Sequence, residues 1–300
     1  MNEMQKIINK ICKEQKIKVN YLSDNWIIEL EKNKKKRYIY GYKFGLNNQS
    51  SSLIADDKYG LYEVLKKNKI KVIEHRIIFK ENIEKIEKYF KEFKKDVVLK
   101  INNGTCGQDV YHINNLEELK KLAEQLLKTN YSLSICPFYE IKQEYRCIIL
   151  DDECLYSYKK IAPIITGDGK SNIKELLSTF NPYYFNTNES FYNKNYSKYM
   201  VPKKGEQIVY NFKHNLSSGA IPENIEKESI KNKIIQMSFK VKDTINIRFA
   251  SIDIIQTKDN KFLVLEANSG VMMENFIKQM NNGYEIAENI YKKAILKMFE

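Results

Sequence analysis

Residues 248–270, RFASIDIIQTKDNKFLVLEANSG, carry the strongest structural signal in this chain of 300 residues. Two apolar runs flank a polar TKDN segment, a pattern that predicts two antiparallel strands joined by a tight turn. A two-residue turn at Asp259 and Asn260 places Asp253 directly opposite Glu266, whereas a four-residue loop makes the two acids diagonal neighbours. Either register leaves the two carboxylates within reach of each other.

The acids of this hairpin, together with one amide, predict a metal site. Asn268 shares a strand face with Glu266 because side chains alternate with a period of two. Like charges opposed across strands are destabilising, so we expect divalent ions between the acids. Two carboxylates and an amide oxygen suit Mg²⁺, which takes one or two carboxylates plus substrate phosphates. The alternative is a hairpin whose acids face water, but four apolar neighbours favour burial: Ile254, Ile255, Val264 and Leu265.

Two lysines lie where a cation is unfavourable unless an anion binds. Lys100 interrupts the apolar run VVLKI, where either a salt bridge or a bound anion must compensate the ammonium group. The following loop contains Gly104 and Gly107, whose backbone amides could approach phosphate oxygens closely. Lys58 lies in the first turn of a predicted helix, where the helix dipole disfavours a cation; an anionic ligand would relieve this, although an exposed lysine there costs little.

Glu144 and Arg146 point the same way on one predicted strand. Asp151 and Asp152 predict a hairpin turn after that strand. This turn would match Glu144 with Lys159 on the next strand. Glu144 is therefore either half of a cross-strand ion pair or part of the same site as the lysines.

The composition excludes several classes of protein. Hydrophobic residues make up 43% of the chain and aromatic residues 12%, too many for intrinsic disorder. Five cysteines form no CxxC pair and three histidines lie far apart, so neither a zinc site nor a disulfide framework is expected. No run approaches the roughly 18 apolar residues of a membrane span, and residues 1–16 lack the apolar stretch of a signal peptide. We expect a soluble, cytoplasmic protein with no membrane partner.

The net charge of +12 comes from 50 basic and 38 acidic residues and fits an anionic partner. The lysines are scattered, however, apart from residues 34–37, which we expect to form a solvated hairpin tip. No aromatic-flanked basic stripe is present, so nucleic-acid binding is not expected.

Periodicity and turn signals predict an α+β chain. Helices are expected over residues 3–15, 58–68, 82–94, 115–128, 171–180, 224–243 and 283–299. Strands are expected at residues 26–30, 38–42, 71–79, 96–101, 110–113, 144–150 and 153–160, before the hairpin at 248–267. The Asn- and Tyr-rich stretch 181–200 has no steady period, and we expect a lid, a substrate loop or a mobile insert there.

Six motifs occur in an order that resembles the ATP-grasp ligases. They are the DK of DDKYGLYEVLKKN, then VVLKINNGTCGQDV, EYR, KKIAPIITGDGKSNIKEL, HNLSSGA and SIDI…LEANSG. The likeness is greatest to the ATP-grasp modules of cyanophycin synthetase and of bifunctional glutathione synthetase, and it runs from about residue 41 to residue 291. It implies an ATP-grasp fold, in which two α+β lobes with antiparallel sheets grip a nucleotide after a short N-terminal segment. We expect the N-terminal segment at 1–52, the small lobe with its glycine loop at 53–134, and the large lobe with the metal and substrate sites at 135–300.

The resemblance also implies roles for individual residues. The ATP site would comprise Lys58, Lys100, Gly104, Thr105, Gly107, Phe138, Tyr139, Glu140 and Glu144, with the lysines on phosphates, residues 138–140 at the adenine hinge and Glu144 on the ribose. Asp253, Glu266 and Asn268 would hold two Mg²⁺ ions, or Mn²⁺ in their place. Arg146 and Lys160 would face an acyl phosphate, and the carboxylate substrate would lie near Asn215, Ser217, Ser218 and Gly219. Departures from the family pattern bear on the hinge and on substrate choice: Asp109, Pro137, Ala220 and Ser251.

The activity that this resemblance implies is ATP- and Mg²⁺-dependent carboxylate–amine ligation. An amino acid or small peptide would be joined to an amine through an acyl phosphate, with release of ADP and phosphate. The alternatives are an ATP-grasp kinase acting on a small molecule and a nucleotide-binding protein without catalysis; ligation to a peptide side chain is a variant of the first activity. By analogy with relatives, we expect a homodimer.

Overall fold

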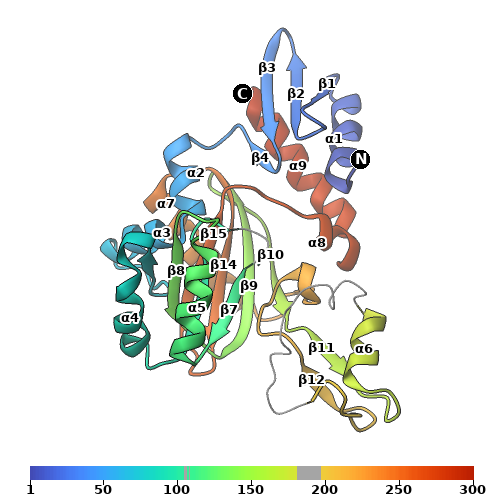
Figure 1. Cartoon of the computed structure of the whole chain (residues 1–300). Helices are drawn as coiled ribbons and strands as arrows, with labels where there is room; N and C mark the ends of the chain where they lie inside the picture. The colour runs from blue at the N-terminus through green and yellow to red at the C-terminus, as the bar shows by residue number, and fades with distance from the viewer. Residues whose placement is uncertain (105–106, 108, 181–196) are drawn as a thin grey trace.

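The computed structural model describes residues 1–104, 107, 109–180 and 197–300, and its sheets are antiparallel (Figure 1). The order of strands in the three larger sheets is β1-β2-β3-β4, β5-β8-β6-β7 and β13-β10-β9-β14-β15, and β11 pairs with β12. Helices cover one face of each larger sheet, so the α+β class predicted from the sequence is confirmed.

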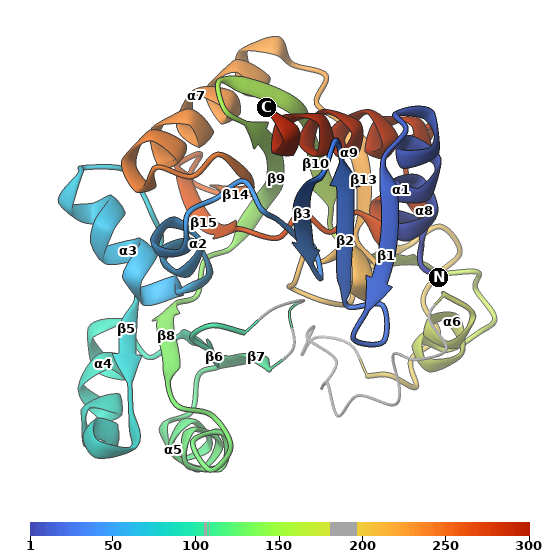
Figure 2. The ribbon, with the colours of Figure 1, turned by 90° about the horizontal axis from the view of Figure 1, so that it is seen from above.

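The N-terminal sheet packs against helices from both ends of the chain. Its elements are α1 (Glu3–Glu14), β1 (Lys18–Leu22), β2 (Ile27–Lys32), β3 (Lys35–Tyr40) and β4 (Lys43–Phe44). The chain ends with α8 (Glu274–Gln279) and α9 (Gly283–Phe299), and α9 lies beside α1 (Figure 2). Ile28, Leu30 and Ile39 share one apolar core with Tyr291 and Ala294 of α9.

The prediction of a basic hairpin tip at residues 34–37 was wrong in the position of the turn. Lys32 pairs with Lys35, so the turn consists of Asn33 and Lys34. Both turn residues have positive φ, 51° and 63°, which suits the right-handed twist of a two-residue hairpin. Lys36 therefore lies within β3, where it donates to Glu29 at 3.0 Å.

The small sheet carries helices on its outer face. The elements of this part are β5 (Arg76–Ile78), η1 (Lys80–Lys85), α4 (Ile86–Glu92), β6 (Val97–Ile101), β7 (Val110–Ile113), α5 (Leu116–Leu126) and β8 (Leu133–Pro137). Leu99 and Ile135 point into a core with Phe90 of α4 and Leu119 of α5. Because side chains alternate along a strand, Val98 and Lys100 face the other way, toward the large sheet.

The large sheet has helices α2, α3 and α7 on one face (Figure 2). Its elements are α2 (Gln49–Asp56), α3 (Lys58–Lys67), β9 (Ile141–Leu150), β10 (Glu153–Ile161), β13 (Ile221–Asn224), α7 (Glu228–Ile245), β14 (Phe249–Thr257) and β15 (Phe262–Asn268). A smaller unit beside it contains β11 (Ile164–Thr166), α6 (Ile173–Phe180), β12 (Gln207–Val209) and η3 (Leu216–Ser218). The segment 181–196 lies outside the described residues, so the expected lid or loop there stays a prediction.

Both expected lobe boundaries fall inside elements. The boundary after residue 52 lies within α2, and the boundary after residue 134 lies within β8. Leu61 and Leu65 of α3, expected in the small lobe, pack against Ile252 and Ile254 of the large sheet. The division into lobes remains a proposal.

The predicted hairpin forms, and Asp253 is paired with Glu266. The loop has neither two nor four residues, because Thr257 N donates to Lys261 O at 2.9 Å around three residues. An extra residue in β15, Leu265, shifts the register by one and restores the pairing. A second bulge, at Leu155 in β10, shifts the register between β10 and β9 by one residue.

Among the helices that the structure describes, none combines the length and the apolar character that crossing a bilayer requires.

Candidate functional site

Four charged side chains, three of them buried and one half-buried, lie where β9 runs between β10 and β14. We call Glu144, Arg146, Lys160 and Asp253 the charge quartet. The strand register places Glu144 opposite Lys160 and Arg146 opposite Asp253. The bulge at Leu155 makes Lys160 the partner of Glu144, so the alternative pairing with Lys159 does not form.

The quartet is tightly bonded. Arg146 donates to Asp253 from Nε to Oδ1 at 2.7 Å and from Nη2 to Oδ2 at 2.6 Å. Lys160 Nζ donates to Asp253 Oδ2 at 3.0 Å and to Glu144 Oε1 at 2.5 Å. Lys160 and Asp253 are 1% exposed and Glu144 is 3% exposed. These three groups have therefore lost their hydration, and the ion pairs within the quartet replace it.

Burial and neighbouring charges set the protonation of the quartet. Burial alone would raise the pKa of Asp253, but Arg146 and Lys160 hold it well below its usual value. Burial raises the pKa of Glu144 to about 7, against the opposing charge of Lys160. Burial and Arg146 lower the pKa of Lys160, but Asp253 and Glu144 outweigh them, so the net shift is upward. Asp253, Arg146 and Lys160 are therefore ionised at neutral pH.

Metal ions are not needed to explain the burial of Asp253. We expected divalent ions to relieve repulsion between Asp253 and Glu266, but two cationic side chains already neutralise Asp253. Glu266 is half-buried and accepts a hydrogen bond from Asn268 Nδ2 at 3.3 Å. The expected divalent ions between Asp253 and Glu266 therefore stay a prediction, although Asp253 does not require them.

The oxygens of this hairpin nevertheless fit a hard cation. Glu266 and Asn268 lie together on the face of β15, and Asp253 is opposite Glu266 in the register. A carboxylate has about four lone-pair positions, so Asp253 can serve a cation beside its two basic partners. Within the described ranges, no three His, Cys, Asp or Glu side chains converge on a metal-holding cluster. Further ligands to an ion at Glu266 would come from a substrate or from water.

Lys58 and Lys100 are both buried, 9% and 6% exposed. Lys58 Nζ donates to the carbonyl of Gly104 at 2.6 Å and to that of Asn102 at 3.2 Å, which joins α3 to the start of the glycine loop. Burial lowers the pKa of Lys58 to about 8; Glu266 opposes this shift and Lys100 adds to it. The two lysines and Glu266 are thus close enough to act on one another, and two cations share a site that favours an anion.

The expected hinge segment is bonded to both neighbouring sheets. Phe138 N donates to Asp96 O at 3.0 Å, and Glu140 O accepts from Lys258 N at 3.0 Å. The Phe138 N–H is thus already engaged, whereas a carbonyl oxygen has a second lone pair, so the adenine-hinge role of this segment stays a prediction. Tyr139 lies in an apolar cluster between the small and the large sheet, whose buried members are Ile73, Val98, Cys136 and Ile255.

The expected substrate segment contacts the glycine loop. A Cβ on Gly107 would lie 1.7 Å from Asn215 Nδ2, so only glycine permits this approach. Ser217 and Ser218 belong to η3, which ends at Gly219 with φ of 96°. A side chain at Gly219 would collide with the Tyr210 hydroxyl, which donates to Ser218 O at 3.3 Å. Thr105, expected on ATP, lies outside the described residues.

Four further residues lie near the site: the sequence marked Asp57 only as a helix cap and His214 as a possible base that is more often structural, and it gave no role to Asn102 or Lys213. Asp57 and Asn102 are joined at 2.9 Å and anchor the start of α3 to the glycine loop. Lys213 Nζ donates to Gly107 O at 3.3 Å. His214 donates from Nδ1 to Lys160 O at 3.3 Å, and burial, with the charge of Lys160, lowers its pKa to about 4. The basic pair directly before the NLSSG motif was the available signal for the last two.

The structure thus brings the expected residues into three adjoining groups. The quartet contains the two expected catalytic residues, one expected metal ligand and Glu144. Glu144 is bonded to Lys160, and whether it also binds a ribose stays a prediction. Lys58, Lys100 and Glu266 form the second group, and Gly107 with Asn215 forms the third.

Comparison with known proteins finds one family over most of the chain. Residues 55–177 and 204–294 match the RimK-like ATP-grasp domain. Coenzyme gamma-F420-2:alpha-L-glutamate ligase of Methanocaldococcus jannaschii is 22% identical over 264 residues, which are 85% of this chain and 72% of that protein.

Solved structures show the same fold. The bifunctional glutathione synthetase of Pasteurella multocida superposes with a TM-score of 0.55 at 17% identity, over 98% of this chain and 44% of that one. D-alanyl-alanine synthetase A of Vibrio cholerae gives a TM-score of 0.59 at 12% identity, over 98% and 93% of the two chains. This chain therefore spans less than half of the glutathione synthetase. The predicted ATP-grasp fold is confirmed.

Proposed function

Because the chain belongs to the RimK-like ATP-grasp family, we propose that it is an ATP-dependent carboxylate–amine ligase. It would activate the carboxylate of an amino acid or small peptide as an acyl phosphate and transfer the acyl group to an amine, releasing ADP and phosphate. The observation that supports the proposal is that Glu266, which the strand register pairs with Asp253 of the charge quartet, also acts on the charge of Lys58. Lys58 and Lys100 would bind the polyphosphate of ATP, and Glu266 would bind its metal ion. Arg146 and Lys160 of the neighbouring quartet would bind the second anion, the substrate carboxylate.

The first task of these residues is to bring two anions together. A carboxylate approaching the γ-phosphate of ATP is repelled, and Lys58 and Lys100 would offset that repulsion by binding phosphate oxygens. Glu266, Asn268 and Asp253 would hold Mg²⁺, which neutralises charge on the transferring phosphoryl group. The backbone of the glycine loop would lie over the same phosphates, tethered through Lys58 to Gly104.

The second task is to stabilise charge on the acyl phosphate. Arg146 is the quartet member whose side chain is 18% exposed, so it can reach a ligand at the open side of the quartet. Its fork of N–H donors matches a carboxylate or a phosphate. Lys160 is more deeply buried than Arg146. His214 donates from Nδ1 to the Lys160 carbonyl, which requires the tautomer with a proton on Nδ1. His214 would thereby fix the strand segment that positions Lys160.

An ADP-release screen over paired amino acids and dipeptides tests this proposal, with hydroxylamine added to trap an acyl phosphate. We expect a substrate pair that releases ADP and phosphate and a hydroxamate when hydroxylamine replaces the amine. Glu266→Gln should reduce the rate by at least about a hundredfold without loss of fold. Glu153→Gln is the matched control, because this exposed acid pairs with Lys293 at the far end of β10.

Several results would contradict the proposal. AMP and pyrophosphate as products would exclude an acyl phosphate made by γ-phosphoryl transfer. A stable phosphorylated product formed without an amine would indicate a kinase. ATP binding with no turnover over the whole panel would indicate a nucleotide-binding protein, and full activity of Glu266→Gln would remove the proposed ion site.

A further inference from the structure

Two cysteines of the β9–β10 hairpin bring their sulfur atoms into contact. Cys147 on β9 and Cys154 on β10 are separated by 3.4 Å between Sγ atoms. A disulfide bond is about 2.05 Å long, so a shift of little more than about 1 Å would join them. The other two described cysteines, Cys12 and Cys136, lie in separate apolar clusters.

The fold of the hairpin explains why the sulfurs meet. Cys154 pairs with Ile149, and side chains two residues apart on a strand share a face, so Cys147 and Cys154 lie on the same side of the sheet. The bulge at Leu155 directly follows Cys154 and increases the local bend of β10. The two sulfurs therefore occupy diagonal positions that the hairpin itself maintains.

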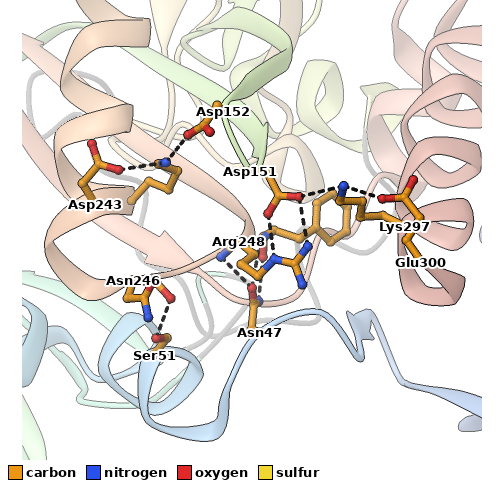
Figure 3. A network of polar contacts seen from close by, with 11 residues as sticks. Asn47, Ser51, Asp151, Asp152, Asp243, Asn246, Arg248, Lys297 and Glu300 are labelled. Atoms are coloured by element: carbon orange, nitrogen blue, oxygen red, sulfur yellow. Dashed lines mark hydrogen bonds and ion pairs between the residues drawn. The ribbon is translucent and has the colours of Figure 1, made fainter.

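The tip of this hairpin is fixed to the rest of the molecule (Figure 3). Asp151 accepts from Arg248 Nε at 2.7 Å and from Nη2 at 3.0 Å, and its backbone N–H donates to Arg248 O at 2.7 Å. Because both strands are held at the tip, the two thiols stay within reach of each other. Such positioning makes an intramolecular reaction compete well with reactions in solution.

The two thiols differ in access and in acidity. Cys147 is 0% exposed, whereas Cys154 is partly exposed. The hydrogen bond between the two sulfurs lowers the pKa of Cys154, and burial only partly opposes it. The same bond, together with burial, raises the pKa of Cys147. Cys154 is therefore the thiol that an oxidant in solution reaches and that ionises more readily.

We propose that Cys147 and Cys154 form a reversible disulfide when the protein meets hydrogen peroxide. In the first step the Cys154 thiolate attacks one peroxide oxygen and the O–O bond breaks, giving a sulfenic acid at Cys154 and a hydroxide ion, which takes up the proton released when the Cys154 thiol ionised and becomes water. In the second step the Cys147 sulfur attacks the Cys154 sulfur, and the hydroxyl group leaves as water with the Cys147 proton. Two thiols lose two electrons, and one peroxide is reduced to two waters. Excess dithiol reverses the reaction by exchange.

Peptide mapping of the peroxide-treated native protein tests the proposal. After treatment, free thiols are alkylated, the chain is cleaved without reduction, and the peptides are identified by mass spectrometry. We expect one cross-linked species in which the peptides of Cys147 and Cys154 have together lost two hydrogen atoms, and its disappearance after dithiothreitol. Cys12 and Cys136 should keep their thiols under the same conditions.

Two variants assign the order of events. In Cys154→Ser the Cys147 thiol should be lost at least about tenfold more slowly than in the unaltered protein, because Cys147 is buried. In Cys147→Ala the sulfenic acid has no partner thiol and should proceed to sulfinic acid at Cys154. The result from the unaltered protein stands whether or not a variant folds.

The proposal is overturned by either of two outcomes in the unaltered protein. One is sulfinic acid at Cys154 while Cys147 remains a thiol, which would show that the sulfurs do not join. The other is loss of the Cys147 and Cys154 thiols no faster than those of Cys12 and Cys136, which would show that the pair is inert.

Discussion

Asp253 is the acid on which the charge quartet depends, because Arg146 and Lys160 both donate to it. Asp253→Asn should lower the free energy of unfolding by about 3 kcal/mol or more, since an amide cannot neutralise two buried cations and would point a donor at one of them. Urea denaturation followed by circular dichroism measures this change.

Glu266→Gln is the matched comparison for that experiment. Glu266 is half-buried and has one hydrogen bond of 3.3 Å, so its replacement should change the unfolding free energy by less than about 1 kcal/mol. Equal losses in the two variants would show that the quartet is not a special element of stability.

Lys58 should make nucleotide affinity depend on pH in the alkaline range. Its pKa is about 8 in the unliganded protein because of burial, so it is charged below pH 8 and loses its proton above it. A bound polyphosphate favours the charged form and raises this pKa. The dissociation constant for ATP should therefore increase by up to about tenfold per pH unit above pH 8.

Isothermal titration calorimetry between pH 7 and pH 10, with Lys58→Arg as the control, measures this dependence. Arginine stays charged over the whole range, so the variant should lose the slope that Lys58 contributes. An unchanged slope in Lys58→Arg would place the titrating group elsewhere and remove Lys58 from the phosphate site.

At the scale of elements, the start of α3 couples a helix to the glycine loop. Asp57 Oδ1 accepts from Gly60 N at 2.7 Å as the helix cap and from Asn102 Nδ2 at 2.9 Å. Asp57→Ala removes both bonds and should lower the free energy of unfolding by about 1–2 kcal/mol. Asp57→Asn keeps an acceptor oxygen at the same position and should cost less than about 1 kcal/mol.

Chemical denaturation of both variants provides the measurement. Equal stability of Asp57→Ala and Asp57→Asn would show that the cap and its bond to the loop contribute nothing. A loss confined to Asp57→Ala would support the coupling of α3 to the loop that the proposed nucleotide site requires.

Most helices and long strands of this chain could be predicted because their signals are local, although the short helices α2 and α8 were not expected. The cap at Asp57 and the periodicity after it located α3 to within one residue of its end, at Lys67 instead of residue 68. Bulges carry no such signal. The sequence gives no reason to expect the extra residue at Leu155, so Lys159 looked like the partner of Glu144 although Lys160 is. Very short strands, such as β4 and β11, were not predicted because two or three residues are too few to show an alternation of apolar and polar side chains.

The candidate site was predictable as a set of residues but not as a set of bonds. The apolar hairpin marked Asp253, strand alternation put Glu144 and Arg146 on one face, and only the family resemblance marked Lys160; the structure brings all four together. Which charge neutralises which depends on strand order, because β9 is the strand shared by β10 and β14. The order of strands in a sheet cannot be predicted from the spacing of residues along one strand.

At the scale of the whole molecule, the N-terminal sheet and the large sheet share one core. Ile28 and Ile39 pack in the same cluster as Ile148, Phe249 and residues of α9, whereas the core of the small sheet is separate. In native-state hydrogen exchange, amides of β2 and β3 should open with free energies within about 1 kcal/mol of those of β9. The small sheet should open as a unit of its own.

Two core variants give the matched test of this arrangement. Ile290→Ala in α9 should lower the protection of β2 and β9 together, and Leu119→Ala in α5 should lower that of β6 and β8 first. Loss of protection in β2 without any loss in β9 would show that the N-terminal sheet is an independent unit.

The mutual bonding of the quartet has a consequence for how a ligand first meets this protein. When Glu144 is ionised, the two cations and two anions of the quartet sum to zero, and opposite charges a few ångströms apart produce almost no field at a distance. Long-range attraction of an anion from solution would therefore come from Lys58, Lys100 and the positive excess of the surface. Arg146 and Lys160 would act only at short range, on a ligand that is already in the site, and would contribute to selectivity and not to the rate of association.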